Sequence, residues 1–121
     1  MGYLSRLYVV EKFEDAGKVD YYSDNRCFAE LHAMFELGKS PLFRDKIRNY
    51  PDTDCYIYAD DGNTRLIEDA YGEKLKEIPI QDAINILKEC IELDSWRTYK
   101  VCLQVLEAFS DTGFVVLHYG H

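Results

Sequence analysis

The sequence predicts a single α+β domain, a mainly antiparallel sheet of about five strands with helices packed chiefly on one face. Three observations support this fold class. The 121 residues are 47% hydrophobic, enough to bury one core without disulfide or metal staples. Apolar residues recur at helical spacing over 81–93 and 95–109, whereas the shorter apolar runs are typical of strands. No linker or repeat divides the chain, so we expect one domain over residues 1–121.

The N-terminal third predicts a hairpin followed by helices. Residues 3–13 alternate loosely, and a Glu-Asp-Ala-Gly turn then leads to a return strand over 18–22. A polar cap within 23–25, an apolar stripe and then Gly38 predict a helix that ends at about Leu37. Ser40 and Pro41 begin a second, short helix, which Pro51 ends.

The remaining elements complete the order ββα(α)ββααβ. Residues 55–59 read as a strand and 64–68 as its partner, because the Asp-Asp-Gly-Asn turn between them suits a tight hairpin. The two periodic helices over 81–93 and 95–109 come next. Residues 114–117 are apolar throughout, which indicates a central strand buried on both faces.

The cysteines and the termini bear on the compartment. No Cys-x-x-Cys pair occurs and the spacings fit no zinc motif, so all four cysteines are expected as buried free thiols in a reducing compartment. The N-terminus lacks the pattern of a signal peptide, and no apolar run approaches the roughly 18 residues of a membrane span. We therefore expect a cytoplasmic protein without a membrane partner. The cysteines are Cys27, Cys55, Cys90 and Cys102.

The charge balance ranks the partners. Twenty-two Asp and Glu against fourteen Lys and Arg give a net charge of -8, which phosphate backbones repel. The one basic cluster, Arg44, Lys46 and Arg48, is interrupted by Asp45 and is too small to anchor a duplex. We expect no direct binding of nucleic acid.

An acidic hairpin is the candidate binding surface. Residues 52–69 hold six carboxylates balanced only by Arg65. Along the strand, Tyr56 and Tyr58 should point away from the helices, and tyrosine is enriched at binding hot spots. Carboxylates around them would favour a basic protein, although an ordinary solvated hairpin has the same composition. The candidate residues are Asp52, Asp54, Tyr56, Tyr58, Asp60, Asp61, Glu68 and Asp69.

Catalytic and metal motifs are absent. No Gly-x-Ser-x-Gly, cysteine–histidine motif or glycine-rich phosphate loop occurs, so we expect neither an enzyme nor a cofactor. A calcium loop centred on Gly62 fails because Ile57 and Ala59 would occupy ligand positions. His118 and His121 should point to opposite faces of an extended segment, and His32 is poorly aligned with Cys27, so no metal site is expected.

Two functions remain from the sequence. In size and charge the chain resembles the accessory proteins that phages use against host defence and the bacterial immunity proteins that neutralise toxins. No aligned residue carries that resemblance, so it transfers no site; it implies an inhibitor of a larger partner with a basic surface, such as a nuclease. The alternative is a small-ligand protein, for which a phosphorylated ligand would need Arg6, Arg26, Arg65 or the 44–48 cluster. The wide apolar girth of the 95–109 helix either is buried or forms a homodimer interface.

Overall fold

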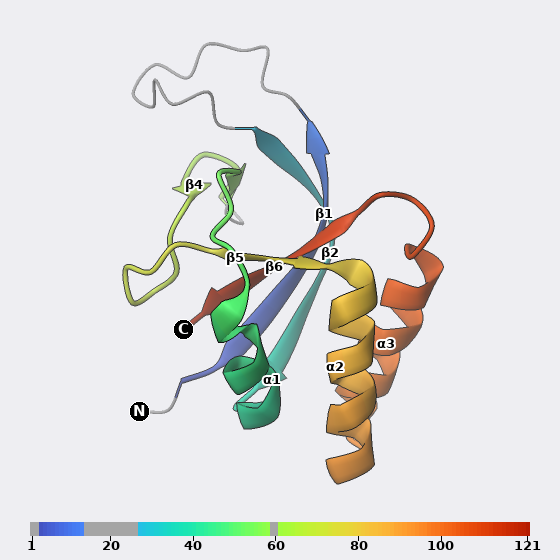
Figure 1. Cartoon of the computed structure of the whole chain (residues 1–121). Coiled ribbons are helices and arrows are strands. Elements are labelled where there is room, and N and C mark those ends of the chain that lie inside the picture. Colours follow the sequence, from blue (N-terminus) through green and yellow to red (C-terminus); the bar gives the residue numbers. More distant parts are fainter. Residues whose placement is uncertain (1–2, 14–26, 59–60) are drawn as a thin grey trace.

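A four-stranded antiparallel sheet forms the centre of the domain (Figure 1). The computed structural model describes residues 3–13, 27–58 and 61–121. The strands are ordered β2-β1-β6-β5, so the first and last strands of the chain pair at the centre of the sheet. Their bounds are β1 Ser5–Phe13, β2 Phe28–Gly38, β5 Lys76–Pro79 and β6 Val115–Gly120.

Three α-helices cover one face of this sheet in the described part of the chain (Figure 1). α2 (Ile80–Leu93) and α3 (Arg97–Ala108) pack side by side, and the short α1 (Pro41–Lys46) continues into the 3₁₀ helix η1 (Ile47–Asn49). Leu7, Val9 and Val116 from the sheet join Phe43, Leu87 and Leu106 from the helices in one buried core. The predicted α+β class and the two long helices are confirmed. No described helix combines the length and the apolar character that crossing a bilayer requires.

A small second layer lies on the opposite face. It holds a two-stranded hairpin, β3 (Ile57–Tyr58) with β4 (Arg65–Leu66), where the sequence predicts longer strands over 55–59 and 64–68. Residues that alternate with the helix-facing ones in β1, Tyr8 and Val10, form a second buried core with Cys55, Ile57 and Leu117. The period of two along β1 thus supplies both cores.

The predicted helix ending at Leu37 is wrong, because residues 28–38 form strand β2. β2 pairs antiparallel with β1 along its whole length, from Phe13↔Phe28 to Ser5↔Gly38. Without this partner one edge of the buried strand β1 would lack hydrogen bonds. Ala33, Phe35 and Leu37 alternate toward the helix-side core, whereas Leu31 and Met34, which belonged to the apparent helical stripe, are exposed. The predicted return strand over 18–22 lies outside the described residues.

The last strands also differ from the prediction. β5 (Lys76–Pro79) is absent from the sequence analysis, because its Lys-Glu-Ile-Pro sequence is mostly polar and ends in proline. Proline is accepted here because β5 is an edge strand. β6 is central as predicted, but it extends to Gly120 and its end pairs with Ser5 of β1.

The prediction of four free thiols is wrong for two cysteines. Cys27 and Cys55 form a disulfide with a Cα–Cα distance of 4.6 Å. A short parallel bridge aligns them, since Ala29 N–H donates to the Tyr56 carbonyl (2.9 Å) and Tyr56 N–H to the Cys27 carbonyl (3.1 Å). Cys90 and Cys102 are free and buried as predicted. Burial raises the pKa of Cys102 to about 12, so this thiol stays protonated and unreactive.

Candidate functional site

Only some residues of the predicted acidic hairpin surface are exposed in the structure. Tyr58 is exposed, but Tyr56 is 4% exposed and lies against Phe28 and under the Arg65 guanidinium, 4.7 Å from its ring centroid. The two tyrosines therefore do not form the shared exposed face that strand alternation predicts, because the layer folds over the start of β2. Asp60 lies outside the described residues. Five candidate residues are exposed: Asp52, Asp54, Tyr58, Asp61 and Glu68.

Several of the carboxylates have local structural partners. Asp52 pairs with Lys76 at 2.8 Å. Asp61 accepts hydrogen bonds from the backbone of Asn63 and Thr64 and from the Thr64 hydroxyl, and these bonds lower its pKa to about 2. Asp69 accepts from the N–H groups of Tyr71 and Glu73, at 2.8 and 3.0 Å, and so fixes the loop between β4 and β5. Asp61 and Asp69 thus stabilise turns.

A cavity of about 520 Å³ lies on the helix side of the sheet, in a region that the sequence did not single out. Its walls come from α1 with η1, from the loop between β4 and β5, and from the segment before β1. In Figure 1, α1 and this loop lie on either side of the end of β6. We call it the basic cavity, because four cations line it. The lining residues are Tyr3, Arg44, Ile47, Arg48, Asp69, Glu73, Lys74, Lys76 and His118.

Two of these four cations lack a carboxylate partner. Arg48 pairs with Asp45 at 3.4 Å and Lys76 with Asp52 at 2.8 Å. Neither Arg44 nor Lys74 forms an ion pair with any residue that the structure describes. The Arg44 guanidinium carbon lies 5.2 Å from the centroid of the Tyr3 ring, and its buried Nε meets no acceptor in the described part of the chain. The positive charges of Arg44 and Lys74 are therefore available to bind an anion at this cavity.

His118 forms part of the cavity wall as a neutral imidazole. It is 3% exposed, and its Nε2 lies 3.0 Å from the Ser5 hydroxyl. Its ring stacks between those of Tyr3 and Phe43, at centroid distances of 6.1 and 6.2 Å. Burial, with a smaller effect of His121, lowers its pKa to about 4. His118 thus lines the cavity without a charge at neutral pH.

Tyr3 closes the cavity next to His118. Burial and the nearby Asp69 and Glu73 raise its pKa to about 12, which keeps the phenol neutral. Backbone bonds fix this corner, since Leu4 and His121 exchange two hydrogen bonds and the Ala70 N–H donates to Gly120. A β-carbon on Gly120 would overlap the Tyr3 ring, so glycine at this position lets the ring lie against β6.

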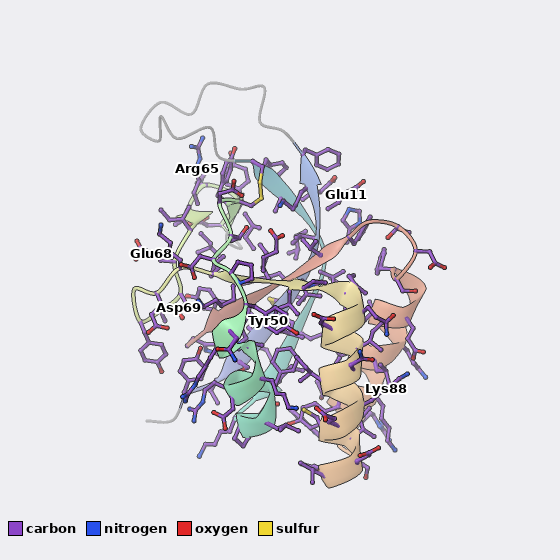
Figure 2. All side chains as sticks on the ribbon, viewed as in Figure 1. Glu11, Tyr50, Arg65, Glu68, Asp69 and Lys88 are labelled. Atoms are coloured by element: carbon purple, nitrogen blue, oxygen red, sulfur yellow. A yellow bond between two sulfur atoms is a disulfide. The ribbon has the colours of Figure 1, made fainter. Side chains whose placement is uncertain are left out.

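A second groove lies between α1–η1 and α2, and several of the polar side chains that line it pair with one another. The Tyr50 hydroxyl donates to Asp82 at 2.9 Å, and Lys46 pairs with Glu89 at 3.1 Å. Figure 2 shows Tyr50 beside α1 and Lys88 on α2, at the two sides of this groove. Among the described residues the buried polar atom without a partner is Arg44 Nε in the basic cavity, and none lies in this groove, so we take the basic cavity as the candidate site.

Metal ligands gather in two places among the described residues. Cys27, Cys55 and Asp54 form one group, whose two sulfurs are joined in the disulfide. Glu11, Glu30 and His32 form the other. His118 and His121 do not meet at a common point, since one nitrogen faces Ser5 and the other Glu36, at 2.9 Å.

The sequence indicates only some of the residues that line the basic cavity. Arg44 and Arg48 were considered as a nucleic-acid patch, and their spacing of four residues after the Ser-Pro helix start was the available signal. Tyr3, Lys74 and His118 lie far apart in the sequence, and nothing local marks them as neighbours. No protein family, curated protein or solved structure matches this chain.

Proposed function

We propose that this protein binds a small anionic ligand in the basic cavity. The observation that carries the proposal is the pair of cations, Arg44 and Lys74, which line a cavity without carboxylate partners in a chain of net charge -8. Arg44 differs from the exposed cations of the surface because its Nε is buried and has no hydrogen-bond acceptor among the residues that the structure describes. A half-buried guanidinium without a partner anion favours a ligand that supplies one.

The cavity restricts the ligand to a compact molecule. A volume of about 520 Å³ is within the range of small-molecule pockets. Arg44 offers the forked donor geometry that suits carboxylate and phosphate groups. Asp69 and Glu73 on the same wall repel a second anionic group there and favour hydroxyl or amine donors on the ligand. The net charge of -8 disfavours extended polyanions at the surface, so a single phosphate or carboxylate group fits better than nucleic acid.

Substituting Arg44 tests this function. With inorganic phosphate and acetate as probes in isothermal titration calorimetry, R44Q should weaken binding roughly tenfold or more, because a charge-assisted hydrogen bond contributes about 1.5–3 kcal/mol. K74Q should have a smaller effect, since Lys74 is exposed. R97Q is the matched control, because it removes the same charge from the exposed start of α3.

Two outcomes would contradict the cavity as the site. If R97Q weakened binding as much as R44Q, the anions would be responding to net charge and not to a site. If the wild-type protein bound neither probe nor any member of a panel of sugar phosphates and carboxylic acids, the anion-binding function would be wrong.

A second candidate function is the binding of a basic protein, as in an inhibitor of the phage or immunity type. It is favoured by the exposed side chains of Tyr58, Asp54 and Glu68 in the predicted acidic hairpin segment. Figure 2 shows Glu68 projecting from the side of the molecule that carries β4. D54N/E68Q should reduce capture of a basic partner at low salt, whereas D111N, in the turn after α3, should not. Equal capture by all three proteins would exclude this surface.

Two further predictions from the sequence stay proposals. A homodimer through the 95–109 helix would have to use Trp96 and Val101, which are 42% and 43% exposed, because Tyr99, Cys102 and Leu106 are buried in the core. A cytoplasmic location would require the Cys27–Cys55 disulfide to persist in a reducing compartment. Structural disulfides are rare there, so the disulfide favours an oxidising compartment.

A further inference from the structure

Two carboxylates and an imidazole meet at the end of the sheet away from the basic cavity. Glu11 of β1 and Glu30 of β2 are register partners on adjacent antiparallel strands. His32 Nε2 lies 3.4 Å from a Glu11 oxygen and 3.9 Å from a Glu30 oxygen. One ligand atom from each of the three residues fits within a span of 4.8 Å. Figure 2 shows Glu11 near the end of β1.

The strand pairing makes this arrangement unfavourable without a cation. Like charges directly opposite each other on neighbouring strands are destabilising, and Glu11 and Glu30 are opposite. The nearby Lys12 pairs instead with Glu77 at 3.0 Å. Neither Glu11 nor Glu30 forms an ion pair with a lysine or arginine among the described residues. A bound divalent cation would remove this repulsion.

The backbone and the aromatic neighbours fix the imidazole. The register shifts between Val9 and Val10, opposite Ala33 and Leu31, so His32 is the extra residue of a β-bulge. Bulges of this kind redirect a side chain and are frequent beside functional sites. The His32 ring packs against Phe114 and Phe109, at centroid distances of 4.6 and 6.0 Å. The aromatic packing limits the rotation of the ring and leaves Nε2 facing the two carboxylates.

We propose that Glu11, Glu30 and His32 form a binding site for a divalent transition metal of the zinc class. Imidazole nitrogen with carboxylate oxygen is a ligand set of zinc sites, in which three protein ligands leave a fourth position for water or substrate. The nitrogen ligand disfavours magnesium and calcium, which prefer oxygen ligands only. The exposed carboxylates leave one side of the metal open to solvent.

Calorimetric titration of the untagged protein with zinc chloride at pH 7.5, without reductant, tests this site. The wild type should bind one zinc ion at this site, and magnesium should not compete. H32Q should remove binding, and E11Q should weaken it by more than the roughly 10–100-fold that loss of an outer-shell partner costs. In the absence of zinc, E11Q should melt no lower than the wild type, because it removes a like-charge pair.

H121Q is the matched control, since His121 is a second imidazole that faces a carboxylate, Glu36. H121Q should retain the zinc affinity of the wild type. Loss of zinc binding in H121Q but not in H32Q would place the metal at the C-terminus and overturn the site. Absence of zinc binding by the wild type would also overturn it.

Discussion

Removal of the Cys27–Cys55 disulfide is expected to lower the free energy of unfolding by about 3–4 kcal/mol. The two cysteines are 28 residues apart, so the disulfide closes a loop that restricts the unfolded chain. In the folded state it holds the start of β2 against Cys55, which is fully buried in the second core. The double variant C27A/C55A should therefore be among the least stable of the variants proposed for this domain.

Urea denaturation with and without dithiothreitol measures this contribution. Reduction should lower the urea midpoint of the wild type and leave that of C27A/C55A unchanged. The double variant is therefore the control for any other effect of dithiothreitol. Cys90 and Cys102 are free, so the reductant has no other disulfide to act on among the described residues. Equal midpoints for the oxidised and reduced wild type would show that the disulfide adds no stability.

Acidification should destabilise the protein through His118. The pKa of this buried imidazole is about 4 in the folded state, against an ordinary value of 6.5, so the unfolded state binds the proton first as the pH falls. The stability linked to the neutral His118 is therefore fully present above about pH 6.5, and the free energy of unfolding decreases as the pH falls toward 4. The difference corresponds to about 3 kcal/mol.

The variant H118F isolates this effect. Phenylalanine keeps an aromatic ring between Tyr3 and Phe43 but has no proton to bind, so its free energy of unfolding should change much less between pH 6.5 and 4.5. H121Q should keep most of the wild-type slope, because His121 is the smaller of the two causes that lower the pKa of His118. Asp61, whose pKa is lowered from 3.8 to about 2, acts only at pH values below this window. A wild-type stability curve as flat as that of H118F would contradict a buried neutral His118.

Local patterns in the sequence predicted those helices and strands whose apolar residues repeat with a single period and form one buried face. In α2, the sequence predicts a stripe of Ile84, Leu87 and Ile91; Ile84 and Leu87 are buried, and Ile91 is partly buried against the same core. The segment of β2 fits both periods, since Phe28, Leu31 and Phe35 suit a helix while Ala33, Phe35 and Leu37 alternate as in a strand. The pairing with β1 decides between them, and a pairing partner is not encoded in the segment itself.

The candidate site was less predictable than the fold. Charge density along the chain pointed to residues 52–69, but folding buries Tyr56 and uses Asp61 and Asp69 in turns. The basic cavity is assembled from both ends of the chain, from α1 and from the loop after β4. Its cations are few and scattered in an acidic sequence, so only the three-dimensional arrangement brings them together.

The central claim is that an anion binds at Arg44. The most direct measurement is an NMR titration with inorganic phosphate that follows the arginine Nε–Hε signals and the His118 ring, with the Arg44 signal assigned by its loss in R44Q. We expect saturable shifts of Arg44 and His118 at one ligand per chain, with Arg97 unchanged. Saturable shifts confined to arginines outside the cavity, such as Arg6 or Arg65, or no shift of Arg44 at all, would contradict it.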